Sequence, residues 1–171
     1  MCGIAGLFDL TGLRPVDEAR LGRMNAAMVH RGPDGDGLHT APGIGLGHRR
    51  LAIIDLHTGH QPMADAQQQL QIVYNGEIYN YRALRRELEA KGHPFLTQSD
   101  TEAILQGYHA WGADVLTHLN GMFAIALWDT RAQSLLLARD RMGEKPLYYT
   151  VCEDGWVLFA SEINAILAGL G

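Results

Sequence analysis

The sequence contains very little cysteine. Its 171 residues include only Cys2 and Cys152, and there is no C-x-x-C pair. Disulfide-stapled secreted domains and cysteine zinc sites need more thiols at closer spacing, so the composition argues against both. The eight histidines are scattered and form no H-E-x-x-H pattern. We therefore expect no metal site.

Basic runs and long apolar segments are also missing. The net charge is −5 and no run of Lys or Arg occurs, which argues against a nucleic-acid partner. The longest apolar run, residues 122–128, is too short to span a bilayer. Asp9 and Arg14 interrupt any apolar core near the start, so the first residues do not resemble a signal peptide. We expect a cytoplasmic protein that does not bind membranes.

The residues that are present suit one globular domain. Apolar residues make up 47% and charged residues 19% of the chain, as in ordinary folded proteins. Periodicity and turn signals predict strands at 2–8, 45–55, 70–74, 122–128, 134–139, 147–151 and 156–160, and helices at about 15–29, 81–91, 99–111, 114–119 and 161–167, with Asn80 and Ser161 as caps. Apolar strands flanked by helices predict an α+β fold with largely antiparallel sheets.

Cys2 is the first candidate for chemistry. If Met1 is removed, Cys2 carries a thiol and a free α-amine on one Cα. Thiols titrate near ~8.5 and α-amines near ~7.7–8.0, so the amine can accept the thiol proton at little cost. One residue then supplies a nucleophile and its base. The alternative is that residue 2 is small by chance.

Two further segments allow a structural and a functional interpretation. Residues 30–37, His-Arg-Gly-Pro-Asp-Gly-Asp-Gly, predict a loop that is either a plain turn or a pocket wall. Arg49 and Arg50 precede an apolar run, and arginine is seldom buried without a partner. One of them lies at a sheet edge or holds a carboxylate through its guanidinium fork. The residues alone do not separate the two arginines.

Asn75-Gly76 and the acidic residues complete the set. Asn-Gly is a common hairpin turn, but at a strand end it also offers a side-chain amide and a backbone N–H that can stabilise an oxyanion. Asp100 or Glu77 can bind an α-ammonium group, although an acidic residue at a helix start is more often a cap.

Taken together, these segments resemble the glutaminase domain of class II glutamine amidotransferases, and most closely the glutamine-hydrolysing asparagine synthetase type. The resemblance runs from residue 2 to about 167. The matching blocks are CGIAG at 2–6, HRGPDGDG at 30–37, GHRRLAIID at 47–55, QPM at 61–63, YNGEIYNY at 74–81, SDTE at 99–102, LNGMFAIALWD at 119–129 and ARDRMGEKPLYY at 138–149.

The resemblance implies a fold and a set of roles. The expected fold is the N-terminal-nucleophile four-layer αββα sandwich with two mostly antiparallel sheets. Cys2 matches the nucleophile, and Asn75 with the Gly76 N–H matches the oxyanion hole. The remaining substrate-binding positions are Arg50 for the α-carboxylate, Glu77 and Asp100 for the amino group and pocket wall, and Leu51 and Ile53 for backbone carbonyls that face the ligand.

The resemblance also implies partners. L-glutamine is the expected substrate, and residues 2–171 are the expected glutaminase domain, which needs no cofactor. ATP and Mg²⁺ belong to a synthetase domain whose S-G-G-x-D-S loop does not occur in this sequence. We expect that domain or subunit to contact residues 140–146 and the C-terminal helix. A homodimer is possible, and the ammonia acceptor is aspartate or the substrate of a relative from an exopolysaccharide locus.

Two alternatives remain. One is an N-terminal-nucleophile amidase that acts on another amide, which the pairing of Arg50 with Asp100 disfavours. The other is a non-catalytic domain that keeps the fold. Cys2, Arg50, Asn75, Gly76 and Asp100 are all intact, which argues against it, but retention of Met1 would remove the base.

Overall fold

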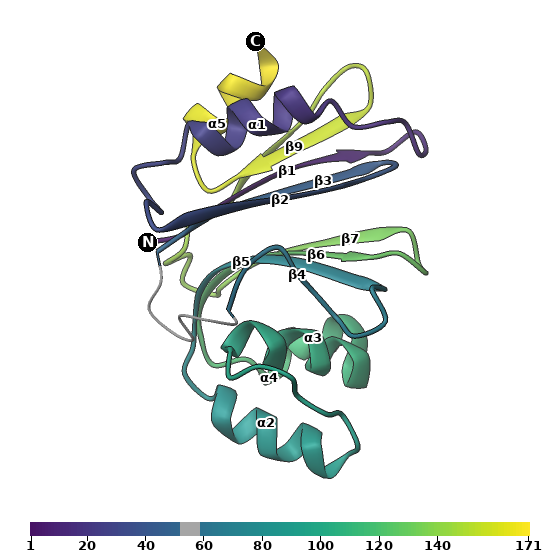
Figure 1. Cartoon of the computed structure of the whole chain (residues 1–171), viewed down its shortest axis with the longest axis vertical. Helices are drawn as coiled ribbons and strands as arrows, with labels where there is room; N and C mark the ends of the chain where they lie inside the picture. The colour runs from purple at the N-terminus through teal and green to yellow at the C-terminus, as the bar shows by residue number, and fades with distance from the viewer. Residues whose placement is uncertain (52–58) are drawn as a thin grey trace.

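Two antiparallel β-sheets face each other between two layers of helices (Figure 1). The structure is a computed structural model that describes residues 1–51 and 59–171. The first sheet has the strand order β2 (Gly35–Ala41), β3 (Ile44–Arg50), β1 (Gly3–Asp9), β9 (Trp156–Ala160) and β8 (Tyr148–Val151). The second has the order β4 (Met63–Ala64), β5 (Leu70–Ile78), β6 (Gly121–Asp129) and β7 (Ser134–Arg139).

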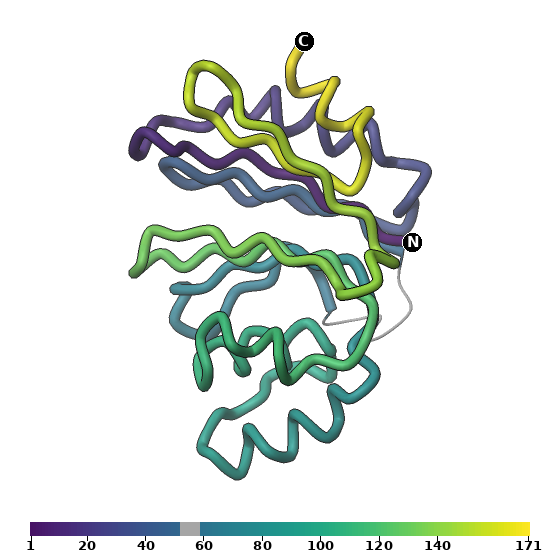
Figure 2. The backbone as a smooth tube through the Cα atoms, turned by 180° about the vertical axis from the view of Figure 1, so that it is seen from behind, coloured from purple at the N-terminus to yellow at the C-terminus, as the bar shows by residue number. Residues whose placement is uncertain are grey.

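The helices cover the outer faces of the sheets. Helices α1 (Glu18–Ala26) and α5 (Ile163–Leu170) lie on the first sheet, and α2 (Tyr81–Ala90), α3 (Asp100–Trp111) and α4 (Val115–His118) lie on the second. Figure 2 shows the same four layers from behind. The predicted α+β class and αββα layering are thus confirmed. None of the helices in the described part of the chain is long and apolar enough to cross a membrane.

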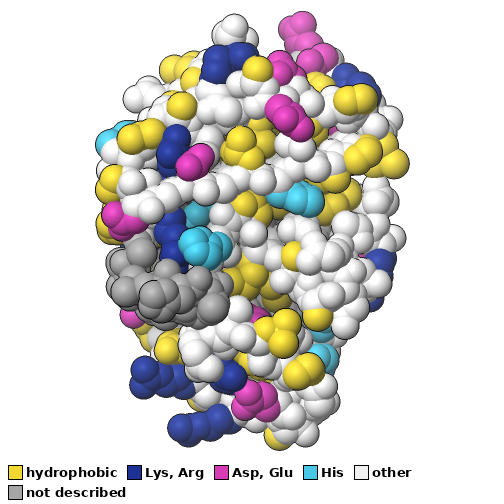
Figure 3. Space-filling view, viewed as in Figure 1, with side chains coloured by type: hydrophobic (Ala, Val, Ile, Leu, Met, Phe, Trp, Pro, Cys, Tyr) yellow, Lys and Arg dark blue, Asp and Glu magenta, His cyan; other side chains and the backbone are white. Residues whose placement is uncertain are grey.

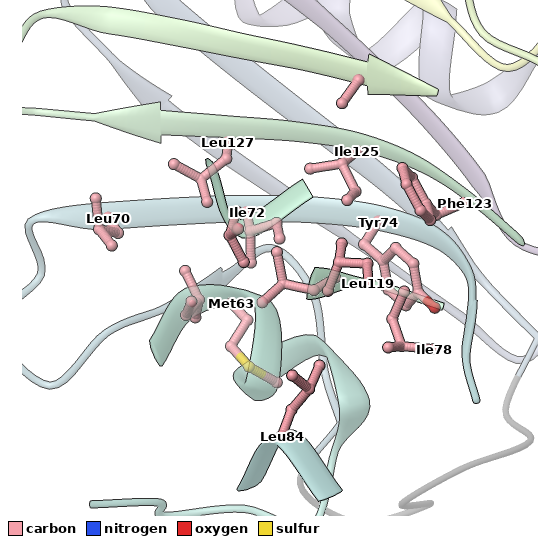
Figure 4. Close-up of a cluster of buried hydrophobic side chains, with 14 of the residues drawn as sticks. Met63, Leu70, Ile72, Tyr74, Ile78, Leu84, Leu119, Phe123, Ile125 and Leu127 are labelled. Carbon is pink, nitrogen blue, oxygen red and sulfur yellow. The ribbon is translucent and has the colours of Figure 1, made fainter. Parts of the chain in front are cut away.

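Alternation along the strands divides the core into three layers. Ile4, Leu46 and Val73 are fully buried between the two sheets. Leu7 and Leu158 face α1 and α5. The second sheet turns its other face to α2, α3 and α4, where Figure 4 shows a cluster of buried side chains. Residues on one strand therefore point alternately to the space between the sheets and to a helix layer.

Asn75 and Gly76 lie inside β5 and do not form a turn. Asn75 pairs with Ala124 and Gly76 pairs with Phe123 of β6. The strand continues to Ile78, four residues beyond its predicted end at 74. The turn interpretation is wrong because long-range pairing outweighs the local turn preference of Asn-Gly.

The loop predicted at 30–37 is shorter than expected. Residues 35–37 begin β2, which pairs along β3 from Gly35 with Arg50 to Ala41 with Ile44. The glycines, aspartates and proline of residues 30–37 predict a loop and not a strand. The start of β2 is extended only because it pairs with β3. The predicted strand at 45–55 is β3 up to Arg50, and its remaining part falls largely outside the described residues.

Two predicted helix caps have other roles. Asn80 precedes α2, but its side chain donates to the carbonyl of His118 at 2.9 Å and accepts from the N–H of Asn120 at 2.9 Å. Ser161 does not cap α5. Its hydroxyl accepts from the N–H of Ile4 at 3.0 Å and so ties β9 to the start of β1. In both cases a tertiary hydrogen bond replaces the local one.

Candidate active site

Three strands direct polar side chains into the space between the sheets. Cys2 has the same parity as Ile4, which packs between the sheets, so its side chain faces the second sheet. On β3, His48 and Arg50 share the face of Ile44 and Leu46. On β5, Asn75 and Glu77 share the face of Val73. The apolar layer therefore ends in a polar cluster at one end of the sandwich.

These side chains line one cavity of about 170 Å³. It contains seven of the eight residues predicted for the site: Cys2, Arg50, Leu51, Asn75, Gly76, Glu77 and Asp100. The eighth, Ile53, lies outside the described residues. The other lining residues, which the sequence analysis did not select, are Met1, His48, Gly59, Gln61, Tyr74, Ser99, Thr101, Met122 and Lys145.

Cys2 is held at the cavity wall by backbone groups. The N–H of Leu51 donates to its sulfur at 3.3 Å, and the thiol donates to the carbonyl of Leu51 at 3.5 Å. The Nε of Arg31 donates to the Cys2 carbonyl at 2.9 Å, and its Nη1 contacts Glu162 Oε1 at 3.0 Å. The thiol and the peptide group of residue 2 are thus fixed from different elements.

Segment 30–34 supports the site without lining it. Arg31 comes from this segment, and the N–H of Asp34 donates to the carbonyl of Arg50 at 3.0 Å. Gly32 packs against the backbone of Arg49 and Arg50 so closely that a Cβ there would overlap it. None of residues 30–37 lines the cavity, so the pocket-wall interpretation does not hold for this cavity. The segment instead holds the end of β3.

Asn75 brings an unpaired donor to the cavity. Its side chain is 2% exposed, and Nδ2 has no hydrogen-bond partner among the described residues. Leaving a buried amide donor unpaired costs about 1–3 kcal/mol. A donor kept in this state is suited to a group that occupies the cavity.

The Gly76 N–H points to the open edge of β5. Gly76 pairs with Phe123 of β6, but both backbone groups of Phe123 bind Asp140 instead. The Phe123 N–H donates to Asp140 Oδ2 at 3.1 Å, and the Phe123 carbonyl accepts from the Asp140 N–H at 2.8 Å. The backbone groups of Gly76 therefore face away from β6. Two residues earlier on the same edge, the N–H of Tyr74 donates to Gln61 Oε1 at 2.6 Å.

Arg50 and Arg49 lie on opposite faces of β3. Arg50 lines the cavity and is 8% exposed. Arg49 points to α1, where its Nε donates to the Asn25 carbonyl at 3.1 Å and Nη1 lies 3.8 Å from Asp36. The structure therefore separates two arginines that the residue pattern left equivalent, and places Arg50 in the cavity.

Asp100 sits at the start of α3 and contacts β5. Its Oδ2 accepts from the Tyr74 hydroxyl at 2.9 Å and from the Ile78 N–H at 3.1 Å. Burial raises the pKa of Asp100, and these hydrogen bonds oppose the rise. Burial also raises the pKa of Tyr74 well above its usual value, and the Asp100 charge adds to the rise, so the phenol remains a donor. The capping residue of α3 is Ser99, whose Oγ accepts from the Thr101 N–H.

His48 is the most deeply buried titratable group of the cavity that the sequence analysis missed. It is 1% exposed, and neither ring nitrogen makes a well-formed hydrogen bond within the described residues. The pKa of His48 is lowered to about 4, mainly by burial and also by the charge of Arg50, while the Tyr74 backbone opposes the shift. Its position two residues before Arg50 in a strand was the signal that could have revealed it.

A second hollow lies on the outer surface and has a different character. Arg82, Arg85 and Arg86 line it together with Glu89 and Gln98. Figure 3 shows basic side chains gathered at this end of the molecule, over α2. Neither a cysteine nor a histidine is among the described residues that line this second hollow. Across the described ranges, no group of three His, Cys, Asp or Glu side chains could hold a metal ion.

Comparison with solved structures defines the class of fold. A structure of glutamine phosphoribosylpyrophosphate (PRPP) amidotransferase from B. subtilis, complexed with ADP and GMP, matches 98% of this chain and 43% of that chain with a TM-score of 0.78. The sequence identity is 22%, so the likeness concerns the fold. The four-layer sandwich of this chain is therefore the fold of that amidotransferase structure.

The family model of the glutamine amidotransferase domain matches residues 1–171, and the chain belongs to this family. Asparagine synthetase (glutamine-hydrolyzing) 3 of Bacillus subtilis is 44% identical over 170 residues, which are 98% of this chain and 28% of that protein. Asparagine synthetase (glutamine-hydrolyzing) 3 of Arabidopsis thaliana is 41% identical over 166 residues, 97% of this chain and 28% of that protein. The chain thus spans little more than a quarter of these curated relatives. The resemblance inferred from the sequence motifs is confirmed.

Proposed function

We propose that this domain hydrolyses the side-chain amide of L-glutamine to glutamate and ammonia. The observation that supports it most is the cavity, which is lined by Cys2, by Asn75 with its unpaired Nδ2, and by Gly76. Arg50 and Asp100 supply opposite charges in the same space. A free amino acid carries both a carboxylate and an ammonium group, which suits this arrangement better than a peptide amide.

The proposed mechanism proceeds through a thioester on Cys2. Once Met1 has been removed, the thiol passes its proton to the α-amine of the same residue. The sulfur attacks the amide carbon, and Asn75 and Gly76 stabilise the oxyanion that forms. The C–N bond then breaks, and ammonia leaves with the proton from the α-ammonium group. Water attacks the thioester, releases glutamate and restores the thiol.

The substrate contacts follow from the charges around the cavity. Arg50 binds the α-carboxylate through its guanidinium fork, for which planar geometry is well suited. Asp100 and Glu77 bind the α-ammonium group. The carbonyl of Leu51, which already contacts the thiol, faces the reacting amide. No metal or organic cofactor takes part in this half-reaction as we propose it.

The ammonia is proposed to pass to an ATP-dependent synthetase domain. The relatives named as glutamine-hydrolysing asparagine synthetases extend well beyond the matched region, since only 28% of each is covered. Asparagine synthesis or a related amide-forming reaction is the proposed destination. ATP and Mg²⁺ would serve that domain and not the cavity described here.

The decisive experiment measures ammonia release from glutamine by protein whose Met1 removal is verified by intact mass. Cys2→Ala is the control. The label 6-diazo-5-oxo-norleucine should add to Cys2 and spare Cys152, which lies in the β8–β9 turn outside the cavity. Cys152→Ala should therefore still be labelled. Ammonia release by Cys2→Ala, or labelling at Cys152, would overturn the proposal.

A further inference from the structure

Lys145 is a buried cation at the cavity wall. It is 6% exposed and lines the same cavity as Cys2. Its Nζ lies 3.1 Å from the sulfur of Met1, which is its one side-chain partner among the described residues. A thioether is a weak acceptor, and burying an ammonium group without a strong partner is costly. Such a placement calls for a functional reason.

The surrounding loop is built to hold Lys145 in place. Asp140 is buried, and its carboxylate accepts from the N–H groups of Glu144 at 2.9 Å and Lys145 at 3.0 Å. From the strand side, Arg139 donates to the carbonyls of Lys145 at 3.1 Å and Gly143 at 2.7 Å. This loop carries the chain from β7 of one sheet to β8 of the other, and Figure 2 shows it close beside the N-terminus.

Removal of Met1 would leave this ammonium group near the new N-terminus. Met1 is a single residue, so its sulfur and the nitrogen of Cys2 are roughly 6 Å apart at most. Nζ therefore lies within about one Debye length, ~8–10 Å, of the α-amine that Cys2 would carry.

We propose that the ammonium group of Lys145 keeps the α-amine of processed Cys2 in its neutral, proton-accepting form. A like charge disfavours protonation of a neighbouring amine. Lys145 is then a positioning residue, because it acts on the reaction through Cys2. This inference rests on the proposed glutaminase function and concerns how its base is kept available near neutral pH.

The acidic groups of the cavity would raise the pKa of the Cys2 α-amine, and the charge of Lys145 opposes this effect. Glu77 from β5 and Asp100 from α3 both favour a protonated amine. Two further cations have to be considered. Arg50 from β3 is assigned to the substrate carboxylate, and Arg31, which lies outside the cavity, donates to the Cys2 carbonyl at 2.9 Å and is paired with Glu162 at 3.0 Å. The remaining titratable groups that line the cavity, His48 and Tyr74, are both neutral.

The test compares Lys145→Met with Lys145→Arg in protein freed of Met1. The measurement is kcat/KM for ammonia release from glutamine between about pH 5.5 and 9. Without the charge, the acid limb of the profile should move to higher pH by about half a unit to one unit. Near pH 6.5, Lys145→Met should be about 3- to 10-fold slower than the parent protein, and it should recover fully above about pH 8.5. Lys145→Arg should keep the parent profile.

Several outcomes would overturn the inference. An acid limb that does not move in Lys145→Met contradicts it, and so does a uniform loss of rate at every pH, which indicates a purely structural role. Lys145→Gln provides a second neutral variant if the methionine variant does not fold, as judged by circular dichroism. If the parent protein releases no ammonia, the proposed function fails. If the parent is active and the limb is unmoved, this inference alone fails.

Discussion

The sulfur of Cys2 lies 3.3 Å from the backbone nitrogen of Leu51. Leu51 directly follows Arg50, the buried arginine of the cavity. The end of β3 therefore fixes both the candidate nucleophile and the candidate carboxylate-binding group. A substitution of Arg50 can therefore also disturb Cys2 through the strand. Its effect has to be compared with that of a control substitution on β3 whose side chain lies outside the cavity.

Arg49 provides that matched control. Arg50→Leu should raise KM for glutamine by about 10- to 100-fold, because a charge-assisted bidentate contact contributes roughly 1.5–3 kcal/mol. The value of kcat should change little, since the contact exists before and during the reaction. Arg49→Leu removes a cation that faces α1, and its KM should match the parent protein. Steady-state ammonia release measures both. Equal KM values in the two variants would contradict the assignment of Arg50.

Asn75→Ala tests the unpaired amide. Loss of one oxyanion donor typically lowers kcat by about 10²–10³-fold, and we expect that loss with a nearly unchanged KM. The free energy of unfolding should fall only slightly, because Nδ2 has no partner among the described residues. Asn25→Ala is the matched control, since Asn25 is equally buried, on α1, outside the cavity. A kcat for Asn75→Ala close to that of the parent would rule out its role in the oxyanion site.

The hydrogen bond between Tyr74 and Asp100 should contribute to stability. Tyr74→Phe removes a donor to a buried carboxylate, for which a loss of about 1.5–3 kcal/mol is expected. Asp100→Asn alters the other partner, and the double variant completes a cycle. Urea unfolding of the four proteins should give a coupling energy of about 1 kcal/mol or more. Additive effects would show that the 2.9 Å contact contributes no pairwise stability.

Much of the fold could be predicted from periodicity. Residues 122–128 are apolar at every position because β6 lies in the centre of the second sheet, with both faces covered. The hairpins of β6 with β7 and β8 with β9 were expected and are present. In contrast, β2 was missed because its glycine-rich start is extended only through pairing with β3.

The candidate site was predictable to the extent that motifs carried it. Seven of its eight predicted residues share one cavity. His48 and Lys145 were not predicted. The spacing of His48 from Arg50 on one strand could have indicated that the two share a face, but no local pattern distinguishes Lys145 from an ordinary surface lysine. His48 is distinguished by its burial between the two sheets, and Lys145 is distinguished by the loop that holds it beside the N-terminus. Such properties arise from tertiary packing and not from spacing along the chain.

His48 predicts how stability depends on pH. Burial lowers the pKa of His48 from 6.5 to about 4, so the folded state holds the neutral form. The unfolded chain binds a proton near pH 6.5, before the folded chain does. The contribution of neutral His48 to the free energy of unfolding is therefore fully present above pH 6.5 and is lost as the pH falls from 6.5 toward 4. The maximum loss is about 3 kcal/mol, and about 2 kcal/mol should already be lost near pH 5.

Urea unfolding at about pH 7.5 and pH 5 tests this, with His48→Gln as the comparison. The glutamine variant cannot titrate, so its free energy of unfolding should change less between the two pH values, by about 2 kcal/mol. Asp129 and Asp140 have lowered pKa values, because hydrogen bonds outweigh burial, and their stabilising effect is lost only at lower pH. The raised pKa of Asp100 acts in the opposite direction but is common to both proteins. The two proteins differ only at residue 48, so an identical pH dependence would show that His48 is not held neutral by burial.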